Sequence, residues 1–306
     1  MYIYLPVALT SINVFLPVCL GLAVGLLSGL FGVGGGWLMT PLLMMLGIQP
    51  AVAAATDAAQ IVGASTSGTY AHWRLGNVDF KMGFHLLIGG FLGGLTGVEI
   101  IKILRLLGNV NFLIKITYVI MLGVIGTFML IESLSKFKNK NKTVEKKEKK
   151  ESVITKFFKS LPFQIHYKKS GVTHSILVTA TVGYIVGILA AIMGVGGGFL
   201  MVPVMFYLLK MPMNIVIGTS LFQIFFTCVE VTFLQAYINH TVDILLAILL
   251  LIGSSFGAQI GAIIGKKIKG EQLRILMAIL VLMVTVKIII ELITPPSILL
   301  SPAGGH

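Results

Sequence analysis

Long apolar runs dominate the sequence and limit the folds that it can adopt. Residues 82–101 and 243–265 each hold one acidic residue and otherwise no Asp, Glu, Lys or Arg. An α-helix of about 20 such residues crosses the hydrocarbon core of a bilayer. The runs are continuous, whereas the strands of a membrane barrel alternate apolar and polar residues. The sequence therefore predicts an all-α polytopic membrane protein.

The composition excludes a soluble enzyme. Charged residues make up 11% of the 306-residue chain, against roughly 25% in an average soluble domain. So few polar groups cannot cover the surface of such a chain in water. Most of the net charge of +12 lies in residues 133–172, which carry 12 Lys and 3 Glu. We interpret this segment as a cytoplasmic loop that follows the positive-inside rule, and not as a nucleic-acid-binding surface.

The chain contains one motif twice. Residues 25–42 read GLLSGLFGVGGGWLMTPL, and residues 187–204 read GILAAIMGVGGGFLMVPV. Smaller matches follow in the same order after each copy. The matching residues are Thr56 with Thr219, Gln60 with Gln223, Val78-Asp79 with Val242-Asp243, and Gly89, Gly93 and Gly97 with Gly253, Gly257 and Gly261. This series predicts two copies of one structural unit.

Each unit is predicted to hold about five helical segments. The apolar runs are 12–31, 37–48, 51–72, 82–101 and 112–132 in the first unit, and 174–193, 199–210, 213–236, 243–265 and 272–293 in the second. The predicted domains are a first transmembrane repeat at 1–132, a Lys-rich cytoplasmic linker at 133–172, a second transmembrane repeat at 173–294 and a short tail at 295–306.

The first two segments of each unit are expected to form a hairpin that is broken, or re-entrant, at the glycines. Residues 37–48 would reach only about 18 Å as a helix, against a hydrocarbon core of roughly 30 Å. A hairpin returns to its starting side, and three full crossings follow it. Each unit then crosses an odd number of times, so the repeats have inverted topology. With the linker inside a bacterial inner membrane, both termini lie outside.

The repeated Gly-Val-Gly-Gly-Gly is the first candidate for a binding site. No predicted strand precedes it and no Gly-Lys-Ser/Thr follows it, which excludes a dinucleotide fingerprint and a P-loop. Broken backbone inside a membrane is tolerated where it lines a cavity, and inverted-repeat transporters place paired breaks around the substrate. The expected substrate-binding glycines are Gly34, Gly35, Gly36, Gly196, Gly197 and Gly198. The alternative is a tight turn between packed helices.

The third segment of each unit carries polar side chains at helical spacing. A Thr and a Gln four residues apart share one helix face in each copy. The expected anion ligands are Thr56, Gln60, Thr219, Ser220 and Gln223. Alternatively, these side chains bond a neighbouring helix. Asp57 stands where the second copy has Ser220, and an ionisable group at membrane depth is a candidate for proton coupling, with helix capping as the alternative.

Other residues carry weaker signals. Trp37 and Phe199 follow the glycines in matching places and are expected to pack. Glycines recur every four residues in the fourth segment of each unit, which predicts close helix packing. Glu99 and Glu230 have no evident partner in the sequence. No cluster of His, Cys or Glu has metal-ligand spacing, so no metal or cofactor is expected.

Taken together, these motifs resemble a known family. Two stretches of Gly-Val-Gly-Gly-Gly, each followed by an aromatic residue, Leu, Met and Pro, precede Thr-x-x-x-Gln. This pattern resembles the TauE/SafE sulfite exporter family of bacterial membrane permeases. The resemblance covers roughly 12–132 and 174–294, without the linker. It implies transport of sulfite, of organosulfonates or of other small organic anions across the inner membrane.

The expected function is secondary transport of an anion by alternating access, with the anion held between the two glycine breaks. The residues by themselves indicate an anion transporter, and the resemblance implies export of sulfite or small organosulfonates. The alternatives are a permease for a carboxylate and one for a metal cation. An enzyme is not expected, because no nucleophile–base pair is visible. The expected partners are the small anion and the lipid bilayer; a homo-oligomer is left open.

Overall fold

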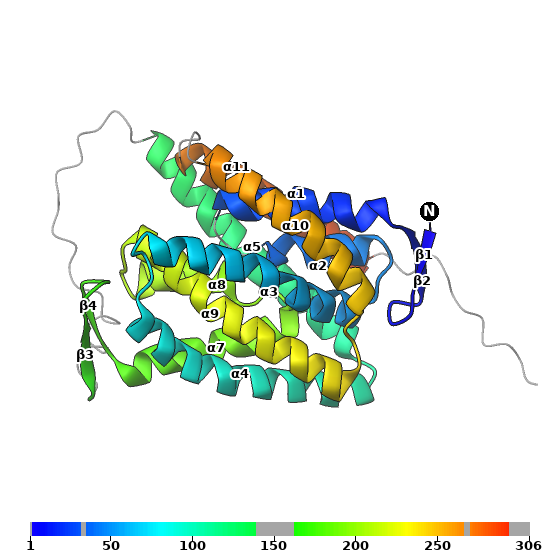
Figure 1. Cartoon of the computed structure of the whole chain (residues 1–306), viewed down its shortest axis with the longest axis horizontal. Coiled ribbons are helices and arrows are strands. Elements are labelled where there is room, and N and C mark those ends of the chain that lie inside the picture. Colours follow the sequence, from blue (N-terminus) through cyan, green and yellow to red (C-terminus); the bar gives the residue numbers. More distant parts are fainter. Residues whose placement is uncertain (1, 32–34, 139–161, 266–269, 294–306) are drawn as a thin grey trace, which may run out of the picture.

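The structure is a computed structural model that describes residues 2–31, 35–138, 162–265 and 270–293 (Figure 1). The first half contains β1 (Tyr2–Leu5), β2 (Thr10–Asn13), α1 (Phe15–Phe31), α2 (Gly36–Met45), α3 (Pro50–Arg74), α4 (Phe80–Leu106) and α5 (Val110–Lys138). The second half contains β3 (Gln164–Tyr167), β4 (Val172–Ser175), α7 (Ile176–Met193), α8 (Gly198–Pro203), the π-helix η1 (Val204–Leu208), α9 (Met213–Leu234), the π-helix η2 (Gln235–Asn239), α10 (Ile244–Gly265) and α11 (Gly270–Ile293). The elements thus follow the same order in both halves.

The apolar runs of the sequence coincide with the helices of the structure. The predicted 51–72 corresponds to α3 and the predicted 272–293 to α11. The runs 199–210 and 213–236 correspond to helices that continue as the π-helices η1 and η2. Of the predicted linker, residues 139–161 lie outside the described residues.

The expectation of an all-α fold misses two β-hairpins. β1 pairs with β2 and β3 with β4, both antiparallel. The second hairpin begins in the segment that the sequence assigns to the linker, 133–172, and ends at Ser175, inside the predicted second repeat. Each strand has only four residues, which is too short for an alternating pattern to stand out beside long apolar runs.

The two halves are packed into each other through paired helices. α1 lies along α10, and α4 lies along α7, so each pair joins one half to the other. Glycines make the contacts close: a Cβ atom at Gly89 would lie 1.8 Å from the carbonyl oxygen of Ala180. A Cβ atom at Gly253 would lie 2.1 Å from that of Val18. The predicted close packing at these glycines is confirmed.

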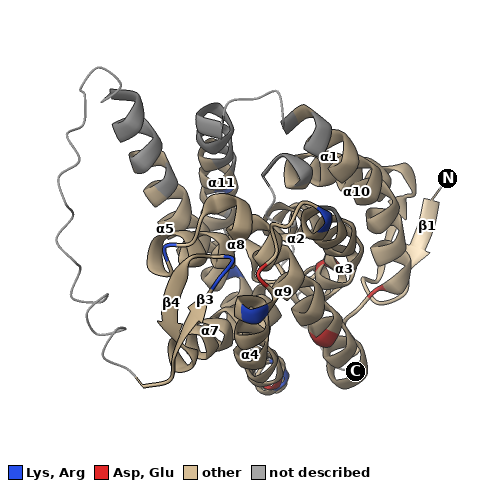
Figure 2. Ribbon diagram, turned by 60° about the vertical axis from the view of Figure 1, so that its left-hand side comes forward, with Lys and Arg blue, Asp and Glu red and all other residues tan. Residues whose placement is uncertain are grey.

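The outside of the bundle is apolar. α10, for example, exposes Ile248, Ile252 and Phe256 at a spacing of four residues, and charged residues are sparse over the ribbon in Figure 2. Among the described residues, five helical stretches are long and apolar enough to cross a membrane: Phe80–Leu106, Val110–Phe128, Ile176–Met193, Met213–Asn239 and Ile244–Gly261. The protein is therefore a multi-pass membrane protein.

The β-hairpins mark the two ends of the bundle. The long helices run roughly along the longest axis of the molecule, with β1–β2 at one end and β3–β4 at the opposite end (Figure 1). Both hairpins stand directly before a long helix of their own half, α1 or α7. Each hairpin also forms hydrogen bonds to the start of a helix of the other half, α10 or α4.

Candidate functional site

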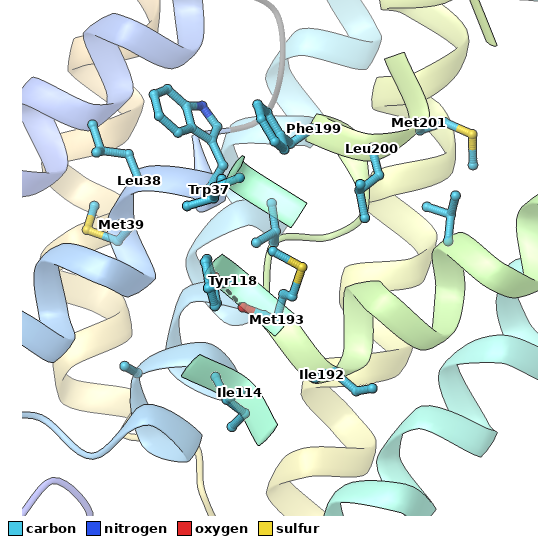
Figure 3. Close-up of a cluster of buried hydrophobic side chains, with 14 of the residues drawn as sticks. Trp37, Leu38, Met39, Ile114, Tyr118, Ile192, Met193, Phe199, Leu200 and Met201 are labelled. Atoms are coloured by element: carbon cyan, nitrogen blue, oxygen red, sulfur yellow. Dashed lines mark hydrogen bonds between the residues drawn. The ribbon is translucent and has the colours of Figure 1, made fainter. Parts of the chain in front are cut away.

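The two glycine breaks meet in the middle of the molecule. Trp37, at the start of α2, stacks on Phe199, at the start of α8, with ring centroids 5.6 Å apart and planes inclined by 23° (Figure 3). A Cβ atom at Gly36 would lie 2.9 Å from the Cα atom of Val195 in the other break. All four residues are buried. Two segments far apart in sequence thus form one contact region.

The backbone of both breaks needs glycine. Gly35 has a φ of 78° and immediately precedes α2, while Gly197 has a φ of 75° and precedes α8. Gly196, with a φ of 66°, also lies in the left-handed region, which side chains other than hydrogen disfavour. Gly198 is the buried first residue of α8. Gly34 lies outside the described residues.

Asp57 of α3 faces the first break. Its Oδ2 accepts a 2.7 Å hydrogen bond from the hydroxyl of Thr40 in α2 and would lie 3.2 Å from a Cβ atom at Gly36. The side chain is fully buried, and its Oδ1 has no hydrogen-bond partner among the described residues. The second copy has Val202 and Ser220 at the positions of Thr40 and Asp57. Thr40 and Asp57 thus both differ from the second copy. This shared difference could have indicated Thr40 as a partner of Asp57, but the sequence analysis did not identify it.

Tyr118 of α5 also reaches the break. Its hydroxyl donates a 2.5 Å hydrogen bond to the carbonyl oxygen of Met193, the last residue of α7 (Figure 3). This bond satisfies a carbonyl that the end of α7 leaves without a helical partner. The indole N–H of Trp37, in contrast, is buried and has no hydrogen-bond partner among the described residues.

The two glutamines lie one helical turn beyond the threonines. Gln60 donates a 2.5 Å hydrogen bond to the hydroxyl of Ser254 in α10, and Gln223 donates a 3.0 Å bond to Thr227 of its own helix. Both glutamines are buried, and the Oε1 of each has no partner among the described residues. The hydroxyl of Ser220 donates to the carbonyl oxygen of Ile217 within α9. The glutamines therefore keep unused hydrogen-bonding capacity, while the serine hydrogen is occupied.

Thr56 belongs to a cluster that we call the first corner: Thr56, Asp243 and the β1–β2 hairpin. The Thr56 hydroxyl accepts a 3.0 Å hydrogen bond from the backbone N–H of Asp243. The Asp243 carboxylate accepts from the N–H of Leu246, at the start of α10. It also accepts from the N–H groups of Val7 and Ala8 in the hairpin, at 3.1 and 3.3 Å.

Thr219 belongs to the second corner: Thr219, Asp79 and the β3–β4 hairpin. The Thr219 hydroxyl accepts a 3.0 Å hydrogen bond from the N–H of Asp79. The Asp79 carboxylate accepts from the N–H of Met82, at the start of α4, and from the N–H and hydroxyl of Ser170 in the hairpin. The match between Val78-Asp79 and Val242-Asp243 was visible in the sequence, but it did not reveal these bonds.

The acidic side chains differ in their surroundings. Glu99 pairs with Lys102 at 3.6 Å on the exposed side of α4. Glu230 of α9 is buried, and neither of its carboxyl oxygens has a hydrogen-bond partner among the described residues. Within the described part of the chain, no three His, Cys, Asp or Glu residues gather closely enough to hold a metal ion. In the described part of the chain, Glu230 and Asp57 are the buried acids that keep an unpaired carboxyl oxygen.

A helical bundle with an apolar outer surface, paired helix breaks and buried polar groups at its centre is the architecture of a membrane transport protein. The sequence model of the family "Sulfite exporter TauE/SafE" matches residues 18–288, so the chain belongs to this family. The protein is thus a membrane transporter of the TauE/SafE family.

Bacterial and plant proteins are similar to this chain. The "Probable membrane transporter protein YunE" of Bacillus subtilis is 30% identical over 285 residues, which is 90% of this chain and 96% of the relative. The "Probable membrane transporter protein YjnA" of the same organism is 28% identical over 89% of this chain and 98% of the relative. The "Sulfite exporter TauE/SafE family protein 1" of Arabidopsis thaliana is 34% identical over 29% of this chain and 20% of its own length. No solved structure matches the chain.

Proposed function

We propose that the protein is a secondary transporter that exports sulfite or small organosulfonate anions by alternating access. The observation that carries this proposal is the contact between the two glycine breaks, where Trp37 stacks on Phe199. At this contact the indole N–H of Trp37 and one carboxyl oxygen of Asp57 have no hydrogen-bond partner among the described residues. The family name, and the same name in the plant relatives, support sulfite as the substrate class.

An anion at this place would be held mostly by neutral donors. Moving a charge out of water costs many kcal/mol unless hydrogen bonds replace the lost hydration. The donors would be the backbone N–H groups of the glycine breaks, the amides of Gln60 and Gln223 and the indole N–H of Trp37. The start of α2 adds a partial positive charge of about half a unit. The proposed ligands are therefore Gly34, Gly35, Gly36, Gly196, Gly197, Gly198, Gln60, Gln223 and Trp37. The expected ligands Thr56 and Thr219 are instead bonded in the corners, and Ser220 is bonded within α9.

The two corners would serve as closures on the two sides of the membrane. We propose that the halves are inverted repeats, with the linker at 133–172 cytoplasmic and both termini outside. The hairpins at opposite ends of the bundle support this arrangement (Figure 1). Opening one corner while the other stays bonded would expose the central site to one side at a time, which is the requirement of alternating access.

Asp57 is the proposed proton-coupling residue at the centre. Its carboxyl group lies beside the first break with one oxygen bonded to Thr40 and the other unpaired. An ionised carboxylate repels a bound anion in a medium of low dielectric constant. Protonation of Asp57 would remove this repulsion and supply a further donor.

Substitutions at the breaks test the site. Gly35→Leu and Gly197→Leu are expected to abolish anion binding. Their side chains would collide with Ser28 of α1 and with Val186 of α7, so each break would be displaced from its position. Gly76→Leu is the matched control: its φ of 73° carries the same backbone strain, but nothing lies within 4 Å of its Cβ position. Binding of sulfite and of a sulfonate is measured by calorimetry on protein shown to be folded. Wild-type affinity in both break variants would place the site elsewhere.

The glutamines test the ligand set in finer steps. Gln60→Leu and Gln223→Leu should each weaken binding by about 1–3 kcal/mol, the scale of an unpaired buried polar group. Competition by a carboxylate, or by a divalent metal ion in the same assay, distinguishes the alternative permeases. The metal alternative has one observation in its favour, the buried unpaired carboxyl oxygens of Asp57 and Glu230. Displacement of sulfite by a carboxylate but not by a metal would favour a broader anion permease.

Labelling of single cysteines tests the proposed topology. Ser11→Cys in the first hairpin and Lys168→Cys in the second are both exposed positions, and Cys19 is replaced by Ser. An impermeant thiol reagent applied to intact cells should label position 11 and not position 168. Labelling of both positions from outside would contradict the inverted arrangement.

A further inference from the structure

One face of α9 carries a buried polar row that leads away from the central site. Gln223, Thr227 and Glu230 are separated by four and three residues and therefore share a helix face. All three side chains are buried, and Glu230 is only 8% exposed. Gln223 donates to the Thr227 hydroxyl at 3.0 Å. The row ends at the carboxyl group of Glu230, whose two oxygens have no hydrogen-bond partner among the described residues.

The row faces two glycines of α4 that leave space for it. A Cβ atom at Gly90 would lie 3.2 Å from Gln223 Nε2 and 3.4 Å from Thr227 Oγ1. A Cβ atom at Gly94 would lie only 2.8 Å from Glu230 Oε2. An alanine at position 94 would therefore force the carboxyl group to move. The absence of a side chain on α4 creates the room in which this acid is buried.

The corresponding row of the first half has no acid. The repeat places Gln60, Ala64 and Ser67 of α3 where α9 has Gln223, Thr227 and Glu230. The hydroxyl of Ser67 donates to the carbonyl oxygen of Ala64, so its hydrogen is used within α3. On the facing helix, Ala258 of α10 corresponds to Gly94 of α4. Among the described residues, the acid and the glycine that makes room for it therefore occur at the α9 row and not at the α3 row.

Charged groups on the neighbouring helices do not pair with Glu230 in the described part of the chain. On α4, Glu99 pairs with Lys102, and Arg105 donates to the carbonyl oxygen of Asn239 in η2. Between Ile176 and Met193, the titratable residue of α7 is Tyr184, and α8 has none.

On α3, Asp57 bonds Thr40, and the other titratable residues are Tyr70, His72 and Arg74 near its end. The side chain of Arg74 lies over the ring of Tyr70. On η1 the titratable residue is Tyr207, whose ring packs on Phe206 and Phe128. Asp57 is thus the buried acid that faces the central site from the other half.

We propose that Glu230 is a proton-binding site that couples protonation to anion binding at the centre. This inference deepens the proposed function and rests on it. When the anion binds near Gln223, the Glu230 carboxylate takes a proton from water and becomes a neutral carboxylic acid, with a new O–H bond and no change of oxidation state. When the anion leaves, the proton returns to water. The proton cancels one negative charge of the bound anion, so binding of a singly charged anion leaves the net charge of the protein unchanged.

The distance between the two sites sets the size of the effect. Seven residues of helix separate Gln223 from Glu230, which corresponds to about 10 Å along the axis. At an effective dielectric constant of about 20, two unit charges at this distance change a binding constant on the order of tenfold. Anion affinity should therefore fall about tenfold as the pH rises through the ionisation of Glu230.

Calorimetry with a small sulfonate tests this inference, because the charge of a sulfonate is constant over the pH range used. Wild-type protein should bind the sulfonate about tenfold more weakly at high than at low pH. It should also take up about half a proton on binding at the midpoint of this pH change, because a tenfold coupling corresponds to a pKa shift of about one unit. Buffers of different ionisation enthalpy measure this uptake. In an Asp57→Asn background, which removes the other proposed proton-binding acid, Glu230→Gln should keep the low-pH affinity at every pH and lose the proton uptake. Glu230→Asp, which retains a carboxyl group, should keep both.

Two further variants distinguish the possible outcomes. Glu99→Gln removes an exposed, paired acid of α4 and should behave as wild type. Asp57→Asn leaves Glu230 in place, and its infrared difference spectrum on binding should still show a gain of protonated carboxyl groups. Unchanged pH dependence when Glu230→Gln is added to Asp57→Asn, or loss of the infrared signal in Asp57→Asn, would overturn the inference while leaving the anion site intact. Absence of sulfonate and sulfite binding to wild-type protein would overturn the proposed function and this inference with it.

Discussion

The two glycine breaks share a backbone but differ in the polar groups beside them. Gly35 and Gly197 have φ values of 78° and 75°, and each immediately precedes a helix that begins with glycine and an aromatic residue. Beside the first break, however, Thr40 donates to the buried Asp57, where the second copy has Val202 and Ser220. The backbone conformation is thus repeated at both breaks, whereas the hydrogen-bonded pair of Thr40 and Asp57 occurs only beside the first break.

The corners show the opposite relation. Thr56 with Asp243 and Thr219 with Asp79 make the same 3.0 Å bond, and both aspartates cap a helix and bind a hairpin. Each corner holds hydrogen bonds between the two halves. The bonds lost by a substitution in one corner would not be replaced by the bonds of the other corner. The corners are thus alike in both halves, whereas the polar groups beside the breaks differ, and substitutions at each place test this difference.

The largest effect is expected at the glycine contacts between halves. Gly89→Ala and Gly253→Ala each place a methyl group about 2 Å from a backbone carbonyl oxygen, so both should be destabilised by on the order of 3 kcal/mol. Gly123→Ala is the control, because its Cβ would meet only the Thr285 methyl group at 3.7 Å. Unfolding in a denaturing detergent measures the difference. A mild effect at one of the two contacts alone would show that the halves are not packed equivalently.

An intermediate effect is expected at the corners. Asp79→Ala and Asp243→Ala each remove a helix cap, which is worth about 1 kcal/mol, and bonds to a hairpin, so the loss should be about 2 kcal/mol. Hydrogen exchange followed by mass spectrometry should show faster exchange at Val7 and Ala8 only in Asp243→Ala, and at Ser170 only in Asp79→Ala. Faster exchange at both hairpins in either variant would mean that the corners open together, against alternating access.

The smallest effect concerns the asymmetric pair at the break. Thr40→Val removes the donor to Asp57 and should cost about 1–2 kcal/mol of stability. Val202→Thr, the matched change in the second break, should change the free energy of unfolding by less than about 0.5 kcal/mol. The double variant Thr40→Val with Asp57→Ser reproduces the second break and should recover most of the loss. Additive effects in this double-mutant cycle would show that Thr40 and Asp57 act independently.

Much of the helical framework could be predicted from the sequence. The apolar runs located the helices because a membrane span needs a continuous run of apolar residues of known length. The repeat identified both glycine breaks, and the spacing of Gly89, Gly93 and Gly97 predicted close helix packing. The β-hairpins were missed because four-residue strands carry little pattern. Thr40, Ser254 and Thr227 were missed as partners because hydroxyl residues are common in helices and their partners are distant in sequence.

Local composition and periodicity define the class of protein, the helices, the repeat and the residue types at the breaks, so these features can be read from the sequence. Which groups meet depends on how the helices pack. Thr56 and Asp243 are separated by 187 positions, and Gln60 and Ser254 by 194. Such contacts arise from the way α1 packs on α10 and α4 on α7. No local pattern encodes that packing, because it is set by the shapes of helix faces that come together only in the folded chain.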